Sequence, residues 1–516
     1  MNSAPRSPSE VLRRSAASFA GRPALIGGST ALTYAELDEC VDGLATRLLA
    51  AGAEPGHRVG LCVAQGPLAL VASAALMRLG CAYVPLDPSH PIGRLRHIVT
   101  SSGMALAVCD TSGRGVAAGL SLRLLDVSGD DLIPHGSKAD LPVLSAQADA
   151  YVMYTSGTTG LPKGVAISQA NLMSLLADAL PLFPFTNDEV WPLQHAYGFD
   201  VSVWEMWAGI AVGAALVAVE GDARRDPERL AELLLRHKAT RLHIVPSVFL
   251  QLAEVVEEEG LHIPLRGVTF CGEPVNYRAL RIWTDAQPGL APPAWYNVYG
   301  ITETTVYNTF KKISQDDVGR ADPASPIGHG YRHSPVAVLD ENLRGAPPGE
   351  TGEIFVGGRQ VAHGYIANPE LSSERFLELP GRTGRWYRTG DFGYADESGS
   401  LHYVGRRDEQ VKIRGFRVEL GELEHAACTL PWVADAAATV VHSSPRGEPL
   451  LALFVVTTGA LPDPEERTRQ ELGILLPPHM MPSQVIRLPE LPHNANGKRD
   501  RRALSARVKQ QRQGLP

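Results

Sequence analysis

The sequence predicts an α/β fold, with a large N-terminal body of mixed sheets followed by a small α+β domain. Helical and strand patterns alternate through residues 1–405, which is typical of sheets covered by helices on both faces. Beyond that point the remaining segment has a strand, a helix and a β-rich run of its own. The chain of 516 residues is long enough for such a division. We therefore expect a core at residues 1–405 and a mobile lid at residues 406–516.

The expected elements follow from the spacing of apolar residues. Apolar residues at helical spacing predict helices at residues 35–51, 68–79, 171–180 and 229–236. Short apolar runs predict strands at residues 58–63, 82–85, 150–155, 241–245, 268–270, 350–357 and 401–405. The C-terminal segment is expected to hold a strand at 409–413, a helix at 420–428 and a β-rich run at 450–456.

Composition and charge exclude several classes of protein. Hydrophobic residues make up 44% and charged residues 20%, which excludes a disordered chain, a coiled coil and a fibrous repeat. The net charge of −8 gives no attraction to nucleic acid or to a membrane surface, so neither partner is expected. The longest apolar stretch, residues 207–219, is too short to cross a bilayer. The six cysteines form no CxxC pair, which favours reduced, buried thiols in a cytoplasmic protein.

A loop at residues 154–164 (Tyr-Thr-Ser-Gly-Thr-Thr-Gly-Leu-Pro-Lys-Gly) has the composition of a phosphate site. Its glycines allow backbone N–H groups to converge on an anion, and its hydroxyls and lysine add donors. The loop is expected to follow a strand and precede a helix; the alternative is an ordinary surface turn. Because its lysine is followed by Gly164, it differs from a Walker loop. The residues expected to hold phosphate are Thr155, Ser156, Gly157, Thr158, Thr159, Gly160 and Lys163.

This loop resembles the phosphate loop of the adenylate-forming superfamily. Four later segments resemble further motifs of that superfamily, in order and at similar spacing: residues 297–305, 387–391, 405–422 and 496–500. Three more segments resemble its peptide-synthetase adenylation branch: residues 80–87, 199–205 and 352–365. The resemblance extends from Leu32 to Arg502 and implies the adenylate-forming enzyme fold, with ATP and Mg²⁺ as cofactors.

The resemblance also implies roles in the attack of a carboxylate on the α-phosphate of ATP. Lys498 would touch the substrate carboxylate and a ribose or phosphate oxygen, although a surface lysine in a basic tail is the alternative. Glu303 would bind Mg²⁺, Thr302 the α-phosphate and Asp391 the ribose hydroxyls. Asn297 and Tyr299 would contact adenine. The other residues expected at ATP are Gly272, Glu273, Pro274, Val298, Gly300, Tyr403 and Arg406.

The substrate is expected to be a small neutral amino acid. Asp200 would bind its amino group, because a carboxylate between apolar neighbours needs a cation or several donors; an N-cap aspartate is the alternative. His195 matches a histidine near the substrate carboxylate, or else packs in the core. The side-chain pocket implied by the resemblance consists of Asp200, Val201, Trp204, His243, Thr269, Cys271, Val298, Val306 and Tyr307, closed by Lys498.

The order Asp-Val-Trp-His at the start of this pocket resembles serine-selecting pockets. Tyr307 and Cys271 depart from that pattern, so threonine, alanine and a small nonproteinogenic analogue remain open. A difference of one methylene gives only about 1–3 kcal/mol of discrimination, so side activity with neighbouring amino acids is expected.

A second half-reaction would move the acyl group to a phosphopantetheine thiol. The resemblance implies rotation about a hinge at Asp408, after which Lys412 and Gly415 face the thiol; Lys412 alternatively is an ordinary exposed strand residue. No phosphopantetheine attachment motif follows Arg502, so a separate carrier protein is expected, although a piece of a larger synthetase would look the same. Whether a small MbtH-like activator is needed stays open.

Two rivals remain. An acyl- or aryl-CoA ligase of the same superfamily would lack the amino-binding Asp200 and accept free coenzyme A. A catalytically silent nucleotide-binding module would carry damage at Lys498, Glu303 or the phosphate loop, and the sequence has none there.

Overall fold

The computed structural model describes residues 5–134, 145–156, 161–224, 226–319, 325–406, 410–413, 416–442, 449–458, 463–492 and 500–513. The chain separates into two compact units. The first comprises Met1–Pro88, Val99–Met153 and Gly164–Arg407, and the second Ser89–Ile98, Tyr154–Lys163 and Asp408–Pro516. The boundary expected at residues 405 and 406 stays a prediction.

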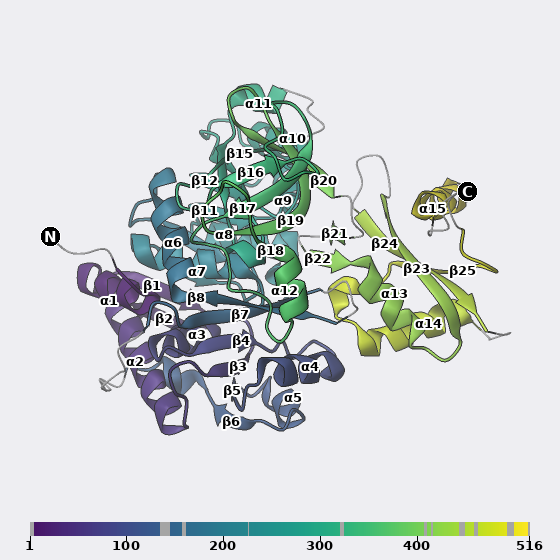
Figure 1. Cartoon of the computed structure of the whole chain (residues 1–516). Helices are drawn as coiled ribbons and strands as arrows, with labels where there is room; N and C mark the ends of the chain where they lie inside the picture. Colours follow the sequence, from purple (N-terminus) through teal and green to yellow (C-terminus); the bar gives the residue numbers. More distant parts are fainter. Residues whose placement is uncertain are drawn as a thin grey trace. The chain divides into compact units, whose positions relative to one another are not determined.

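A six-stranded sheet has the order β6-β5-β3-β4-β7-β8. Its strands are β3 (Arg58–Cys62), β4 (Ala82–Pro85), β5 (Leu106–Cys109), β6 (Arg123–Asp126), β7 (Asp149–Thr155) and β8 (Lys163–Ser168). The pairs of β3, β4, β5 and β6 are parallel, so their carboxyl ends point the same way. Helix α3 (Pro67–Arg78) packs on β3 and β4, and α2 (Tyr34–Ala50) packs on α3 (Figure 1).

A ten-stranded sheet has the order β11-β12-β13-β14-β15-β20-β19-β17-β16, with β18 paired to β19. Its strands are β11 (Arg241–Ile244), β12 (Gly267–Phe270), β13 (Ala294–Tyr299), β14 (Thr309–Lys312), β15 (Ser325–Gly330), β16 (Val336–Leu339), β17 (Gly352–Gly357), β18 (Phe376–Glu378), β19 (Arg385–Ala395) and β20 (Leu401–Arg406). Strands β11, β12 and β13 are parallel to one another, whereas the pairs from β13 onward are antiparallel.

A third sheet, of order β2-β1-β10-β9, completes the first unit. Its strands are β1 (Pro23–Gly27), β2 (Thr30–Thr33), β9 (Val190–Leu193) and β10 (Ala215–Ala218). The remaining helices outside the C-terminal segment are α1 (Pro8–Ser18), α4 (Ile92–Ser102), α5 (Arg114–Ala118), α6 (Gln169–Ala179), α7 (Asp200–Val212), α8 (Pro227–Arg236), α9 (Pro246–Glu259), α10 (Tyr277–Asp285), α11 (Gln315–Gly319) and α12 (Pro369–Arg375).

Local sequence explains where several of these helices begin and end. A capping box starts α2, since the Thr33 hydroxyl accepts from the backbone of Glu36 and the Glu36 carboxylate accepts from the backbone of Thr33. Helix α8 starts with an Asp226 cap and a proline in its first turn. Helix α7 is apolar nearly all round and ends at Gly213 in the left-handed conformation, so it forms a buried element of the core.

The C-terminal segment has its own core. Strands β23 (Val433–His442), β24 (Pro449–Thr457) and β25 (Gln484–Arg487) form one sheet, and β21 (Gln410–Ile413) pairs with β22 (Phe416–Glu419). Helices α13 (Leu420–Cys428) and α15 (Arg501–Gln513) pack on β23, and α14 (Pro464–Leu475) packs on β25 (Figure 1). The α/β class is confirmed, and each expected element is present within two residues of its expected bounds.

Two expectations are wrong. The phosphate loop leads into strand β8 and not directly into a helix, because Val165 and Ile167 are buried and form part of the six-stranded sheet. Helix α6 begins only afterwards, at a capping box of Ser168 and Asn171. Cys428 is exposed, unlike the other five cysteines, because it shares the solvent-facing side of α13 with His425. Within the described residues, none of the helices has the length and apolar character that a membrane span requires.

Candidate active site

Several of the expected site residues of the first unit lie at or near the ends of parallel strands. His243 on β11 is the register partner of Thr269 on β12. Cys271 directly follows β12, and the segment from Gly300 to Glu303 directly follows β13. Because the carboxyl ends of parallel strands meet at one edge of a sheet, the topology brings these side chains together at the usual position of an α/β ligand site.

The chain after β13 folds back sharply on itself. A Cβ on Gly300 would come within 2.1 Å of the Val306 carbonyl oxygen, so only glycine fits there. Thr305 and Val306 have φ values of 61° and 67°, which is unusual for β-branched residues. Gln360 holds this turn, because its Nε2 donates to the Tyr307 carbonyl oxygen at 2.7 Å. A strained turn fixed by a buried amide is the kind of backbone that is found at functional sites.

Asp200 lies at the start of α7 and is partly buried. Burial raises the pKa of its carboxyl group, although a hydrogen bond with the Thr302 side chain opposes the shift. In the described part of the chain, no basic side chain forms an ion pair with Asp200. His195 makes only a smaller contribution that lowers this pKa, so a cation brought by a ligand would further stabilise the charged carboxylate.

His195 and Glu205 form a buried pair beside Asp200. Nδ1 of His195 lies 2.7 Å from Oε1 of Glu205, and the His195 backbone N–H donates to Oε2 at 3.1 Å. Burial lowers the pKa of His195, but the Glu205 carboxylate and a hydrogen bond with Cys271 outweigh it and raise the pKa to about 10. The imidazole is therefore cationic at neutral pH.

Glu303 lies in a short 3₁₀ helix, Thr302–Thr304, and its side chain is buried. Its Oε1 accepts a hydrogen bond from the Tyr365 hydroxyl at 2.8 Å, and that hydroxyl lies 2.7 Å from the hydroxyl of Tyr387. Described residues form no cluster of three or more metal-ligating side chains. A single oriented carboxylate fits Mg²⁺, which is commonly held by one or two carboxylates together with nucleotide phosphates.

Asp391 on β19 joins two other expected nucleotide residues. Its Oδ2 accepts from the Tyr299 hydroxyl at 2.6 Å, and its Oδ1 accepts from Nη1 of Arg406 at 2.8 Å. Asp391 and Arg406 are also register partners of β19 and β20. The Tyr403 ring lies 6.1 Å from that of Tyr299. The expected ribose carboxylate is therefore a fully buried group held by strands that are distant in sequence.

Replacing Asp391 with asparagine is expected to lower the free energy of unfolding of the first unit by about 3–5 kcal/mol, because Arg406 would lose a buried carboxylate partner. Thermal unfolding monitored by circular dichroism would measure the lowered midpoint. Arg388→Gln is the matched control: Arg388 pairs with Glu353 between β19 and β17 but is half exposed, so its loss should cost less than about 1 kcal/mol. Equal losses in the two variants would contradict the prediction.

The residues expected to contact adenine differ in their hydrogen bonds and in their exposure. Nδ2 of Asn297 donates to the Pro326 carbonyl oxygen at 2.8 Å, which leaves Oδ1 to accept from an adenine amino group. Gly272 has a φ of 84°. Oε2 of Glu273 accepts from the backbone of Ser247 at 3.0 Å, and Pro274 is exposed.

The residues expected to line the side-chain pocket lie together in the first unit. The ring of Trp204 is 5.6 Å from that of Tyr307 and 6.2 Å from that of His243. Trp204, Cys271, Val298, Val306 and Tyr307 belong to one buried cluster, against which Val201 packs. Burial lowers the pKa of His243 to about 3, so its ring is neutral, and neither ring nitrogen has a hydrogen-bond partner among the described residues.

Other expected residues lie in the second unit or outside the described residues. Thr155, Ser156 and Lys163 are described within the second unit, and the backbone of Lys412 belongs to β21. The expectations that fall outside the described residues concern Gly157, Thr158, Thr159, Gly160, Asp408, Gly415 and Lys498. Their part in the site stays a prediction.

Three residues that hold the expected site residues were not predicted from the sequence: Glu205, Tyr365 and Gln360. The sequence could have indicated a role for Glu205, because it is an acid between Trp204 and Met206 in an apolar helix. A buried acid requires a partner. Tyr365 ends a motif that pointed only to a branch of the superfamily. Gln360 lies in the same motif, but its contacts were not predictable because they depend on a turn more than 50 residues earlier.

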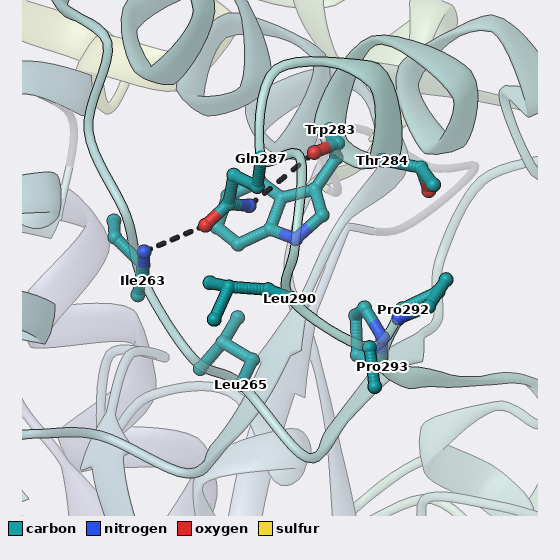
Figure 2. A pocket seen from close by; sticks show the side chains of 9 residues that line it. Ile263, Leu265, Trp283, Thr284, Gln287, Leu290, Pro292 and Pro293 are labelled. Atoms are coloured by element: carbon teal, nitrogen blue, oxygen red, sulfur yellow. Dashed lines mark hydrogen bonds between the residues drawn. The ribbon is translucent and has the colours of Figure 1, made fainter.

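The crevice drawn in Figure 2 belongs to a different part of the first unit. Gln287 bridges it by accepting from the Ile263 backbone at 2.6 Å and donating to the Trp283 carbonyl oxygen at 3.3 Å. Its volume is about 10 Å³, room for one water molecule at most. None of the expected site residues lines it, so it is a packing feature.

Comparison with known proteins identifies the class. A family model described as "AMP-binding enzyme" matches residues 12–366, and one described as "AMP-binding enzyme C-terminal domain" matches residues 422–498. The chain is 36% identical to syringomycin synthase SyrB1 of Pseudomonas syringae pv. syringae, over 96% of this chain and 81% of that protein. It is also 36% identical to malpinin synthetase of Mortierella alpina, over 94% of this chain but only 6% of that protein.

Among solved structures, an artificially fused adenylation-PCP di-domain, NpsA-ThdA from Klebsiella oxytoca, aligns with a TM-score of 0.82 and 26% identity, over 93% of this chain and 86% of that chain. The fold is thus that of the adenylate-forming ligases. The chain belongs to the AMP-binding enzyme family, in the adenylate-forming superfamily, and resembles its nonribosomal peptide synthesis members.

Proposed function

We propose that the chain activates a small neutral amino acid with ATP and Mg²⁺ as an aminoacyl adenylate, and then transfers the aminoacyl group to the phosphopantetheine thiol of a carrier protein. Asp200 carries this proposal. It is a partly buried carboxylate beside Thr302, and burial raises its pKa. A substrate α-ammonium group would add a direct cationic partner for this carboxylate. A fatty or aromatic acid would supply none.

The pocket supports a short, hydroxyl-bearing side chain, with serine as the best candidate. The buried rings of Trp204 and Tyr307 limit its depth. Neutral His243 has two ring nitrogens without partners among the described residues, and the same holds for Nε1 of Trp204. A hydroxyl group both donates and accepts, so it can partner such atoms, whereas a methyl group leaves them unsatisfied. Alanine is therefore disfavoured relative to serine, and threonine would have to fit one more methyl group.

The first half-reaction brings together two anions, the amino-acid carboxylate and the α-phosphate. Catalysis must therefore come from positioning and from fixed cations. Lys498 and Mg²⁺ on Glu303 are assigned to this task, with Thr302 at the α-phosphate and cationic His195 close to Asp200. The loop of residues 155–163 is assigned to the β- and γ-phosphates, and Asp391 to the ribose.

The second half-reaction is supported by the relatives. NpsA-ThdA is described as an adenylation-PCP di-domain, and SyrB1 as a syringomycin synthase. We assign the hinge to Asp408 and the thiol-facing strand to Lys412 and Gly415. A carrier protein is the proposed partner, and an MbtH-like activator would be an additional one.

Amino-acid-dependent ATP–pyrophosphate exchange tests the proposal. We expect exchange with serine, less with threonine and alanine, and none with benzoate or a fatty acid. The decisive pair is serine and 3-hydroxypropanoate, which differ only in the α-amino group. Exchange that occurs only with acids lacking an amine would overturn the role of Asp200 and favour an acyl- or aryl-CoA ligase.

A further inference from the structure

Glu205 is a buried acid that the proposed reaction does not use. Its side chain is fully buried in α7, five residues after Asp200, whereas the His195 side chain is 13% exposed. Both carboxylate oxygens are directed to one residue, since Oε1 meets Nδ1 of His195 and Oε2 accepts from the His195 backbone N–H. The carboxylate therefore fixes both the ring and the backbone of His195.

A second residue, Gln65, holds the backbone of the same segment through two hydrogen bonds. Nε2 of Gln65 donates to the His195 carbonyl oxygen at 3.1 Å, and Oε1 of Gln65 accepts from the backbone of Tyr197 at 3.1 Å. The His195 backbone is thus tied by its N–H to Glu205 and by its carbonyl to Gln65. A ring held in this way cannot turn without breaking a buried charge-assisted hydrogen bond.

We propose that Glu205 is a positioning residue for adenylate formation: through its two contacts it holds the ring and the backbone of His195 in one orientation. The inference rests on the proposed function. Its chemical consequence is a fixed positive charge next to the place where a carboxylate and a phosphate approach each other. A preorganised charge of this kind stabilises the transition state without reorganisation during the reaction.

Among the surrounding groups, Glu205 makes the largest contribution that raises the pKa of His195, and Cys271 makes a smaller one. From α7, Asp200 and Glu205 interact with His195. From β11, His243 is neutral and Arg241 is paired with Glu189 at 2.8 Å. Cys271 after β12 contributes a hydrogen bond, and burial holds the pKa of the Tyr307 hydroxyl well above 10. Without Glu205, burial would dominate and lower the pKa of His195.

The pH profile of ATP–pyrophosphate exchange tests this inference through Glu205→Gln. The glutamine carbonyl can still accept from Nδ1 but does not stabilise the charge. We expect kcat to be nearly independent of pH between about pH 6 and 9 in the native enzyme, because the pKa of His195 is about 10. In the variant kcat should fall by about 10²-fold at pH 8 and much less at pH 6, with the KM for ATP little changed.

Two further variants serve as controls. Glu205→Asp keeps the charge and should retain the flat profile at a reduced rate. Glu189→Gln makes the same substitution in another buried ion pair of the first unit. It should lower the thermal midpoint without changing the shape of the pH profile of kcat. A uniform, pH-independent loss in Glu205→Gln, or the same profile in Glu189→Gln, would overturn the proposal.

Thermal unfolding provides a readout that does not depend on activity. In the native protein the folded-state pKa of His195 is raised from 6.5 to about 10. Its stabilising contribution is therefore complete below pH 6.5 and is lost as the pH rises through about 10. The difference in midpoint between native protein and Glu205→Gln should shrink over this range. A constant difference contradicts the pairing even if no amino acid supports exchange, so this result is distinguishable from failure of the proposed function.

Discussion

Asparagine in place of Asp200 is expected to lower kcat/KM for the amino acid by about 10²–10³-fold, since removing one member of a buried, hydrogen-bonded charge pair costs about 2–5 kcal/mol. Asparagine keeps the shape of the side chain, and Asp200 makes no side-chain cap of α7, so the loss reports the missing charge. Steady-state exchange with serine and with 3-hydroxypropanoate measures it. The variant should lose serine activity and lose its preference for serine over the des-amino acid.

The matched control separates ammonium binding from helix capping. Asp226 caps α8 by accepting from the backbone of Glu228 and Arg229, and it is not among the expected site residues. Asp226→Asn should leave kcat/KM unchanged. If the two asparagine variants behave alike, or if Asp200→Asn keeps its preference for the amino acid, the role of Asp200 in binding the ammonium group is wrong.

Alanine in place of Lys498 is expected to reduce adenylate formation by at least about 10²-fold, because a single preorganised donor to a developing charge is worth about that much. The thermal midpoint should not change, because Lys498 is expected to contact the substrate and ATP and not to pack in the core. Transfer from a preformed aminoacyl adenylate to a carrier protein should proceed at nearly the native rate, because the second half-reaction is assigned to a state in which Lys498 has left the site.

Lys509 provides the comparison for Lys498, since both belong to the same basic C-terminal segment. Lys509→Ala should retain full exchange activity. Near-native exchange in Lys498→Ala would assign this lysine to an ordinary surface position.

Elements stabilised by local sequence were predictable. Helix α13 has the expected bounds, and α2 begins one residue before its expected start, where the capping box lies. Strand β8 was missed because its apolar run is short and follows a glycine, so that only pairing in the sheet identifies it as a strand. The four-stranded sheet was not predicted either, since β1 pairs with β10, which is nearly 200 residues away.

The candidate site was likewise predictable only in part: its residues could be named from the sequence, but most of their contacts could not. Asp200 was visible as an acid among apolar neighbours, whereas its hydrogen bond with the Thr302 side chain was not predicted. The bond between Tyr299 and Asp391 joins residues 92 positions apart, and the one between Tyr365 and Glu303 joins residues 62 positions apart. Such pairs depend on the order of strands in the sheet. Motifs can name the participants, but only the fold shows which of them hold one another.

The pairing of Asp391 with Arg406 has a mechanical consequence. Arg406 ends β20, and its guanidinium is clamped to the neighbouring strand one position before the first unit ends at Arg407. Torsional change in the backbone would disrupt this clamp if it occurred at or before Arg406. The ion pair therefore fixes the last residue of β20 to the neighbouring strand, so the sheet of the first unit is held in place up to Arg406.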